Sequence, residues 1–385
     1  MPALNSIAEM AAEMKLWRRH LHAHPEIGMD CGETAGFVVE KLRAFGVDEV
    51  HPGIGQTGVV ALIHGRAPGR TIGLRADMDA LPLPETTGAP HASLTQGRAH
   101  ACGHDGHTTM LLGAARYLAE TRAFAGTVAV IFQPGEEIGE GGKAMLSDGL
   151  MDRFAISEVY ALHTDPTTPL GHFATRPGPF MAAVTDFEII LTGKGGHGAY
   201  PQDSADPVAA ALMLGQGIMT ILARNTDAND QLVISLTQIH AGSAPNVIPD
   251  TARLGGTIRS YRPEVQAMAL QRLAQIAQGT AAAMGVSVTL RDLGGLAPVI
   301  NDPDCASFAA SVAAEITGDA TTAHRQLLIA EDFGAMLEAR PGAMLFMGQG
   351  IGPGLHETAF DFNDAAAPLG ASFFARLVER RLPLP

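Results

Sequence analysis

Short apolar runs alternate with helical patterns in the first half of the chain. Runs rich in β-branched residues predict buried strands, and the segments between them carry apolar residues at helical spacing. The predicted strands are residues 59–63, 71–74, 128–132 and 159–162. The predicted helices are 34–45, 108–120 and one that starts near Ile7, at a Ser6-Ile-Ala-Glu9 capping box, and ends before Pro25. This order is typical of an α/β domain with a parallel or mixed sheet.

The middle of the chain has a different order of elements. Strands are predicted at 187–191, 232–239, 252–258 and 286–290, and helices at 207–224 and 263–284. The order β-α-β-β-α-β is that of a ferredoxin-like unit. From about Asp302 the α/β pattern returns, with helices at 305–316, 332–339 and 371–381 and a strand at 343–347.

The predicted fold is therefore α/β, with a discontinuous domain and an insertion. A catalytic domain with a mixed central sheet is expected in two parts, residues 1–182 and 294–385. The inserted ferredoxin-like α+β domain is expected at residues 183–293.

Composition and charge narrow the function classes. The 385 residues include 26 Lys and Arg against 40 Asp and Glu, so the formal net charge is −14. An acidic chain without a basic cluster argues against nucleic acid or an anionic membrane as the partner. Three cysteines are too few for a disulfide framework, and no secretory signal or confident membrane span is evident. We expect a soluble cytoplasmic protein with reduced thiols.

Acids and histidines follow four of the predicted strands. In chain order they are Asp77 and Asp79, Glu136 and Glu137, His163 and, after a glycine-rich loop, His356. The helix at 108–120 is preceded by His100-Ala-Cys-Gly-His-Asp-Gly-His107, which adds a thiol and imidazoles. Ligands bind outside the carboxyl ends of the strands in open α/β sheets, so these side chains are expected to share one crevice.

That set of side chains predicts a metal centre. Thiolate, imidazole and carboxylate ligands together favour zinc, manganese, cobalt or nickel over calcium or magnesium. The candidates outnumber the ligands of one closed tetrahedral site, so two ions with a bridging ligand fit better, and paired ions serve hydrolysis. In the adjacent pair Glu136-Glu137, one carboxylate can bind metal while the other acts as a general base. The alternative is two solvated surface acids, which the apolar strand before them disfavours.

Several other segments have two interpretations. Gly53-Ile-Gly-Gln-Thr-Gly58 matches the dinucleotide-binding fingerprint, but it opens a β-rich run and not a helix, so a turn into a strand is favoured. The trio His20, His22 and His24 lies at a helix end, where packing is a better interpretation than metal binding. An arginine such as Arg259 could hold a substrate carboxylate or lie on the sheet surface.

Eight motifs together resemble one family. They are Arg18-Arg-His-Leu-His-Ala-His-Pro25, Leu74-Arg-Ala-Asp-Met-Asp-Ala-Leu-Pro82, His100-Ala-Cys-Gly-His-Asp-Gly-His-Thr108, Phe132-Gln-Pro-Gly-Glu-Glu137, Gly195-Gly-His-Gly-Ala199, Asn246-Val-Ile-Pro-Asp250, Glu331-Asp-Phe333 and Asp361-Phe-Asn-Asp364. The chain resembles amidohydrolases of the aminoacylase/carboxypeptidase type of metallopeptidases. Within them it is most similar to hippurate hydrolases, N-acyl-amino-acid amidohydrolases and auxin-conjugate hydrolases. The resemblance covers nearly the whole chain, in order.

The resemblance implies roles for individual residues. The ligands of two divalent ions would be Cys102, which bridges, with His104, Glu137, His163 and His356. Glu136 would be the general base and Asp79 would orient a ligand. His197 would stabilise the oxyanion, supplied by the partner's insertion in a homodimer or higher oligomer. Asn246 and Arg259 would bind the substrate carboxylate. Asp77 is not expected to be a ligand, because distant relatives carry histidine there.

The expected activity is hydrolysis of the amide bond of a small N-acyl amino acid, such as an N-acetyl or N-benzoyl compound. Dipeptidase or carboxypeptidase activity on short peptides is the alternative for the same site. Other classes are a dinucleotide-binding oxidoreductase, a barrel-type metal hydrolase that uses His22 and His24, and a silent metal-binding protein. The presence of Glu136, which metal binding alone does not need, speaks against the last.

Overall fold

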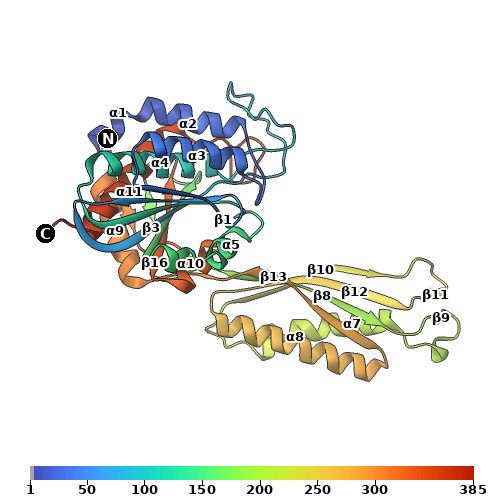
Figure 1. Cartoon of the computed structure of the whole chain (residues 1–385). Helices are drawn as coiled ribbons and strands as arrows, with labels where there is room; N and C mark the ends of the chain where they lie inside the picture. Colours follow the sequence, from blue (N-terminus) through green and yellow to red (C-terminus); the bar gives the residue numbers. More distant parts are fainter. Residues whose placement is uncertain (1–3) are drawn as a thin grey trace. The chain divides into compact units, whose positions relative to one another are not determined.

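The computed structural model describes residues 4–385, which group into two compact units (Figure 1). The first unit runs from the N-terminal end to Phe180 and continues in Ile300–Arg325 and Asp332–Pro385. The second unit consists of Met181–Val299 and a short late segment, Gln326–Glu331, which the sequence did not assign to it. Each unit contains its own cluster of buried apolar side chains.

An eight-stranded mixed sheet forms the centre of the first unit. The strand order is β1-β2-β4-β3-β5-β16-β6-β15. The strands are β1 Glu49–Ile54, β2 Gly58–His64, β3 Ala67–Asp77, β4 Ala125–Gln133, β5 Ile156–Asp165, β6 Phe173–Ala174, β15 Ala320–Thr321 and β16 Gly342–Gly348. The four central strands β4, β3, β5 and β16 run parallel, whereas β1 and β2 pair antiparallel. The expected α/β fold with a mixed central sheet is confirmed.

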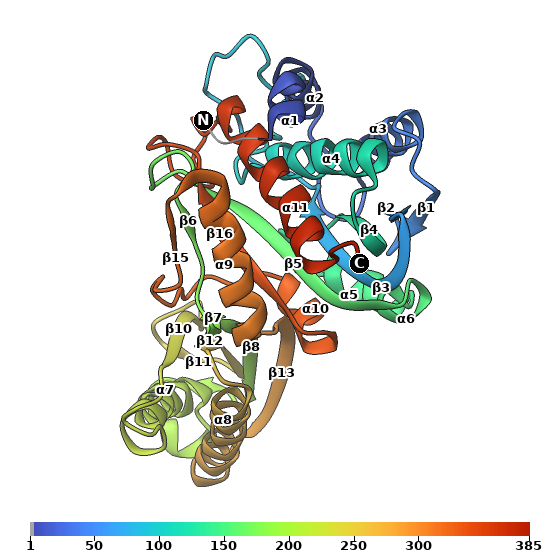
Figure 2. The same ribbon diagram turned by 90° about the vertical axis from the view of Figure 1, so that its left-hand side faces the viewer.

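Helices cover both faces of this sheet (Figures 1 and 2). One layer contains α1 Asn5–Glu9, α2 Ala11–Ala23, α3 Gly32–Ala44, α4 His104–Thr121, α9 Pro303–Thr317 and α11 Ala367–Arg381. The other layer contains α5 Gly141–Ser147, α6 Leu150–Arg153 and α10 Phe333–Ala339. The central helix of the first layer is α4, which packs against α2, α11 and β3 and is buried over most of its length. Its N-terminal end therefore has a fixed place beside the ends of the strands.

Two local predictions are corrected near the N-terminus. The first helix is broken at Met10 into α1 and α2, and it begins at Asn5, so Ser6 lies inside the helix and caps nothing. The Leu4 N–H donates to Ser372 Oγ at 3.0 Å, a long-range bond that sets where the helix begins. The strand β1 was not predicted, because Pro52 within it is tolerated only in an edge strand.

The glycine-rich segment 53–58 links β1 to β2 in an antiparallel hairpin. Gly53 and Gly55 have φ angles of +83° and +60°, which glycine adopts without strain. The predicted turn into a strand is confirmed. No helix follows the segment, so it lacks the strand–turn–helix context that a dinucleotide-binding motif requires.

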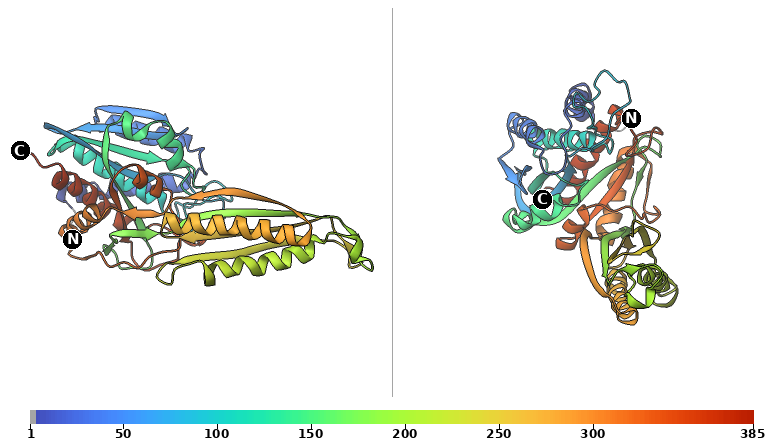
Figure 3. Two further views of the ribbon diagram at one scale, coloured as in Figure 1. Left: turned by 90° about the horizontal axis from the view of Figure 1, so that it is seen from below. Right: turned by 90° about the vertical axis from the view of Figure 1, so that its right-hand side faces the viewer.

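The second unit is built on a four-stranded antiparallel sheet in the order β10-β12-β8-β13. Its elements follow the chain as β8 Ala183–Thr192, α7 Pro207–Arg224, β10 Leu232–Ala241, β12 Thr251–Ser260, α8 Pro263–Met284 and β13 Ser287–Leu296. Both helices lie on one face of the sheet, as Figure 3 shows. A small ribbon of β9 Gly196–His197 and β11 Val247–Ile248 extends beyond it. The remaining short pieces are β7 Gly178–Met181, β14 Val299–Asn301, η1 Pro201–Asp203 and η2 Asp364–Ala366.

Within residues 4–385, α7 is the one helix long and apolar enough to cross a membrane. One face of α7 packs into the core of the second unit through residues such as Leu214 and Ile218. The side chains of Leu212, Met213 and Met219 on the same helix are exposed. A core helix of a folded domain passes the same length and composition test, and the predicted buried helix is correct for one face only.

Close packing on α4 gives a test of the fold. A Cβ added at Gly106 would lie 2.3 Å from the ring of Phe362, which is 1% exposed. We expect Gly106→Ala to lower the melting temperature by several degrees, because overpacking a core costs about 1–3 kcal/mol. Thermal unfolding followed by circular dichroism measures the change.

Gly36→Ala is the matched control. Gly36 lies inside α3 and has no atom within 4 Å of an added Cβ. Alanine in a helix interior is more stable than glycine by about 0.5–1 kcal/mol, so this variant should melt slightly higher than the parent protein. Equal melting temperatures for the Gly106→Ala variant and the parent would contradict the packing described here.

Candidate active site

The carboxyl ends of parallel strands bring the predicted acids and histidines together. Glu136 and Glu137 follow β4, His163 lies at the end of β5, and His356 follows β16. The helix α4 begins at His104, directly after Cys102. All of the predicted ligands therefore lie in the first unit, at the edge where β3, β4, β5 and β16 end.

Cys102 belongs to two groups of three potential ligand atoms. The atoms of Cys102, His104 and His163 lie within 4.8 Å of one another, and so do those of Cys102, Glu137 and His356. The Cys102 Sγ lies 3.4 Å from His163 Nε2, and Glu137 Oε1 lies 3.4 Å from His356 Nε2. Two groups that share one thiol have the form that a bridged pair of ions requires.

Hydrogen bonds turn one nitrogen of each buried histidine toward this cluster. His104 Nδ1 donates to the Asp79 carbonyl at 2.8 Å, and His163 Nδ1 donates to the Thr164 carbonyl at 2.7 Å. Each Nε2 is therefore free of a proton when the ring is neutral. Among the described residues, His104 Nε2 and Glu137 Oε1 are buried without a hydrogen-bond partner. Such atoms are costly in a protein interior, and a divalent ion would satisfy both.

The buried carboxylate of Asp79 orients the adjacent glutamates. Its Oδ1 accepts the N–H of Glu136 at 3.0 Å, and its Oδ2 accepts the N–H of Glu137 at 3.2 Å. Burial, with the nearby charges of Asp77 and Glu137, raises the pKa of the Asp79 carboxyl despite its contact with His104. Asp79 thus links the turn after β4 to the histidine that begins α4.

Asp77 and His107 form hydrogen bonds with each other and with neighbouring residues. His107 Nδ1 donates to Asp77 Oδ1 at 2.6 Å, and the N–H of Thr164 donates to His107 Nε2 at 2.9 Å. Asp77 Oδ2 accepts from Arg75 Nη1 at 2.7 Å. Burial lowers the pKa of His107 to about 4, so its ring is neutral. The spacing from Cys102 suits His107 as well as His104, and it was the family resemblance that named His104 alone; in the structure both ring nitrogens of His107 have hydrogen-bond partners.

The three histidines at the end of α2 form no metal array. His24 Nδ1 lies 2.7 Å from the His20 carbonyl, and the His20 ring stacks on Phe37 at 4.8 Å. His22 instead points to Asp105, at 2.7 Å. These residues end a helix and do not follow a strand, which excludes the barrel-type arrangement.

The predicted residues of the second unit fall into two places. His197 and Asn246 lie together at the β9–β11 ribbon (Figure 1), where the Gly198 N–H donates to the Asn246 carbonyl at 2.8 Å. Arg259 lies near the opposite end of β12, eight residues beyond Thr251, which corresponds to about 26 Å of strand. The structure therefore brings His197 to Asn246 and separates both from Arg259.

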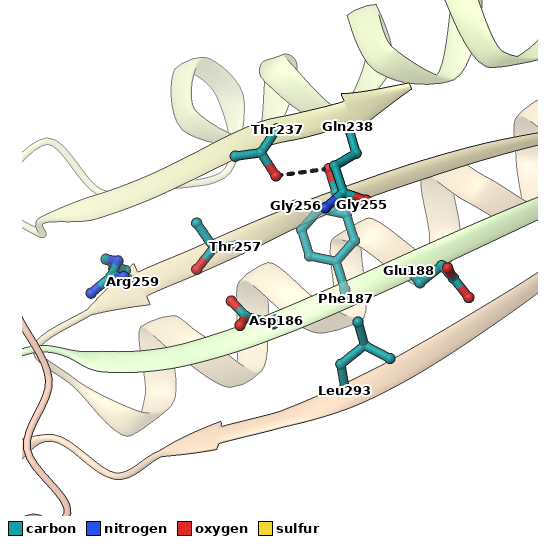
Figure 4. A pocket seen from close by; sticks show the side chains of 10 residues that line it. All are labelled: Asp186, Phe187, Glu188, Thr237, Gln238, Gly255, Gly256, Thr257, Arg259 and Leu293. Atoms are coloured by element: carbon teal, nitrogen blue, oxygen red, sulfur yellow. Dashed lines mark hydrogen bonds between the residues drawn. The ribbon is translucent and has the colours of Figure 1, made fainter. Parts of the chain in front are cut away.

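Arg259 lines a groove of about 310 Å³ on the sheet of the second unit (Figure 4). The arginine is at one end of the groove and Glu188 is near the other. Arg259 Nη1 donates to the Leu328 carbonyl at 2.7 Å, which orients the guanidinium. Glu188 pairs with Arg253 and Arg291. Arg259 is the basic side chain that lines the groove, beside the acidic Asp186 and Glu188, and its guanidinium can donate to an anionic group.

Comparison with known proteins identifies the family. Residues 73–380 match peptidase family M20/M25/M40. The chain is 37% identical over 385 residues to hippurate hydrolase of Campylobacter jejuni, covering 99% of this chain and 100% of that one. It is 36% identical over 361 residues to N-acetylcysteine deacetylase of Bacillus subtilis, covering 94% of each. A solved Bacillus subtilis structure described as a dinuclear metal binding peptidase from the M20 family matches with a TM-score of 0.86 at 33% identity, covering 97% of this chain and 99% of that one.

The chain therefore belongs to peptidase family M20/M25/M40. The family resemblance inferred from its motifs is confirmed, including the similarity to hippurate hydrolase.

The charge on His22 gives a pH-dependent prediction. Burial opposes that charge, but the hydrogen bond and the charge of Asp105 raise the pKa of His22 to about 9. Because the folded-state pKa lies above the unfolded value of about 6.5, the stabilisation is complete below that pH and is lost as the pH rises toward 9. It amounts to about 3 kcal/mol.

Urea unfolding of metal-free protein at pH 6, 7.5 and 9 measures this effect. The difference in unfolding free energy between the parent and His22→Gln should narrow steadily over that range. A difference that stays constant from pH 6 to pH 9 would show that folding does not shift the pKa of His22, and a stabilisation that grows from pH 6 to pH 7.5 would show that the ring is neutral in the folded protein.

Proposed function

We propose that this protein is a metal-dependent amidohydrolase that cleaves N-acyl amino acids with N-acetyl, N-benzoyl or similar acyl groups. The observation that carries the proposal is the pair of ligand groups that share Cys102, with the carboxylate of Glu136 beside them. Two relatives carry names that describe hydrolysis of such substrates, hippurate hydrolase and N-acetylcysteine deacetylase. The products are a carboxylic acid and a free amino acid.

The proposed ligands divide into two sets around Cys102. His104 and His163 complete one set, and Glu137 and His356 complete the other. Two divalent ions held there, of manganese, zinc, cobalt or nickel, would supply Lewis-acid activation of a water molecule and of the scissile carbonyl. Burial raises the pKa of the Cys102 thiol well above its usual range, so the thiol stays protonated until metal binds and a proton is released.

Glu136 is the proposed general base. Two carboxylate oxygens, Glu136 Oε2 and Glu137 Oε1, each lie 3.9 Å from His104 Nε2. Glu137 also contacts His356, which leaves Glu136 as the carboxylate for proton transfer. In this mechanism Glu136 takes a proton from the attacking water and passes it to the leaving amine.

The second unit supplies the proposed substrate contacts. Arg259 binds the carboxylate of the substrate by charge-assisted hydrogen bonds, together with Asn246, and His197 stabilises the oxyanion. An N-acyl amino acid has about the length of a dipeptide, roughly 7 Å, whereas about 26 Å of strand separates Arg259 from the ribbon. One chain therefore cannot place His197 and Arg259 on the same substrate molecule.

A homodimer resolves this separation. We assign residues 183–293 to a ferredoxin-like lid and dimerisation domain, and residues 1–182 and 294–385 to the catalytic domain. The element order and strand order of the second unit support that assignment. Each lid then contributes Arg259 to one active site and His197 with Asn246 to the other. A cytoplasmic location fits the oxidation-sensitive Cys102 thiol.

A substitution at Glu136 tests the general base. Glu136→Gln should retain two metal ions and lose about 10²–10⁴-fold in kcat, because proton transfer is removed and metal binding is not. The assay measures free amine released from N-acetyl, N-benzoyl and indole-acetyl amino acids and from dipeptides, and elemental analysis counts the metal.

Glu137→Gln is the matched control, since it should lose metal as well as activity. Near-normal turnover by Glu136→Gln would contradict the assignment. Turnover of dipeptides alone would move the substrate class to short peptides.

Mixed dimers test whether His197 acts across the interface. His197→Ala alone should lower kcat about 10²–10³-fold, the typical loss of one oxyanion donor. When His197→Ala and Glu136→Gln chains are mixed at equal amounts, half of the dimers are mixed and each has one intact site. About a quarter of the parent activity should return, and activity no higher than that of the single variants would show that His197 acts within its own chain.

A further inference from the structure

His356 and His104 lie on segments that need support from elsewhere. The His356 side chain is 54% exposed, and its φ angle of +63° is unfavourable for a residue with a side chain. It belongs to the stretch without helix or strand between β16 and η2, and its N–H donates to the Ala101 carbonyl at 2.8 Å. His104 begins α4, whose N-terminal end has no side-chain cap. Other contacts must therefore hold both ligands in place.

The chain after His356 packs directly on the start of α4. Phe360 and Phe362 are 2% and 1% exposed. A Cβ at Gly103 would lie 3.4 Å from the Phe360 ring, and one at Gly106 would lie 2.3 Å from the Phe362 ring. The two glycines thus allow the segment that carries His356 to lie against the helix that carries His104.

One buried guanidinium joins the same two segments by charge. Arg18, on α2, is 1% exposed. Its Nη1 donates to Asp361 Oδ1 at 2.6 Å, and its Nε donates to Asp364 Oδ1 at 2.7 Å. The same Nη1 lies 3.6 Å from Asp105 Oδ2, on the residue after His104. Arg18 is therefore the cation that the His356 segment and the first turn of α4 have in common.

His22 makes a second link from the same face of α2. It is four residues after Arg18, which places both side chains on one side of the helix. His22 Nδ1 donates to Asp105 Oδ2 at 2.7 Å, and Nε2 lies 3.3 Å from Glu85 Oε1. None of these side chains belongs to the proposed ligands or to the proton-transfer step. The Arg18-Arg-His-Leu-His22 motif therefore has a structural link to the metal centre that the mechanism does not use.

We propose that Arg18 and His22 are positioning residues for metal binding, which hold Asp105 and the segment 361–364 and thereby keep His104 and His356 in place before metal arrives. The inference rests on the ligands of the proposed function and is independent of the substrate. The ion bound by Glu137 and His356 depends on this support more than the other, because His104 is also held by the Asp79 carbonyl.

Titration of metal-free protein with Co²⁺ tests the inference, since the visible absorption of Co²⁺ reports both its affinity and its ligand geometry. Arg18→Met should lower the affinity for one of the two Co²⁺ ions by about 10–100-fold, the usual effect of removing a residue that orients a metal ligand. Arg18→Lys keeps the charge and loses the planar fork, so its loss should be smaller. Asp361→Asn should act in the same direction as Arg18→Met. A melting curve of each metal-free variant accompanies the titration.

Arg381→Met is the matched control, because it removes a partly buried ion pair that is remote from the ligands. Arg381 donates to Glu158 at 2.7 and 2.8 Å near the start of β5, whereas His163 lies at its end. This variant should melt at a lower temperature with both Co²⁺ affinities unchanged.

Two results would overturn the inference. In the first, all three variants (Arg18→Met, Arg18→Lys and Asp361→Asn) have a lower melting temperature than the parent but the same affinity for both Co²⁺ ions. The other is an equal loss of affinity in Arg381→Met. A parent protein that binds two Co²⁺ ions but hydrolyses no N-acyl amino acid would defeat the proposed function and leave the positioning role standing.

Discussion

The carboxylate of Asp79 makes the contacts on which the geometry of the candidate metal centre depends. It accepts hydrogen bonds from the backbone N–H groups of both Glu136 and Glu137, while the backbone carbonyl of Asp79 accepts one from His104 Nδ1. These bonds join the turn after β4 to the start of α4, and they set which glutamate faces which neighbour. The ends of strands fix the positions of loop residues only loosely. A carboxylate that accepts a hydrogen bond on each oxygen fixes its two partners more precisely, because hydrogen bonds allow only a narrow range of distances.

Buried charge surrounds this centre on two sides. Arg75 pairs with Asp77 and Asp332 behind the strand ends, and Arg18 pairs with Asp361 and Asp364 on the other side of α4. Such pairs contribute little net stability, because desolvation offsets their attraction. Their value here is positional, since each guanidinium donates from a planar fork that fits its carboxylates in only a few geometries.

The length of the sheet in the second unit is the reason that the proposed mechanism needs two chains. Its long antiparallel sheet carries Arg259 near one end of β12 and His197 with Asn246 at the ribbon beyond the other. A strand is stiff and rises about 3.3 Å per residue, so these groups keep their separation. A small substrate that needs both must receive them from two chains, which makes assembly part of the proposed catalytic site.

The sequence by itself determined the α/β class and most element positions, because strand periodicity is a local property. The side chains after each strand and the family resemblance together predicted the ligands of the candidate metal centre. The sequence missed the edge strand β1, which contains Pro52, and the start of the first helix at Asn5, because these depend on pairing with β2 and on the bond from Leu4 to Ser372. The spacing after Cys102 suits both His104 and His107, and the choice of His104 came from the family resemblance. Only the tertiary structure gives the physical reason, since it pairs His107 with Asp77 and Thr164 and leaves His104 Nε2 without a hydrogen-bond partner.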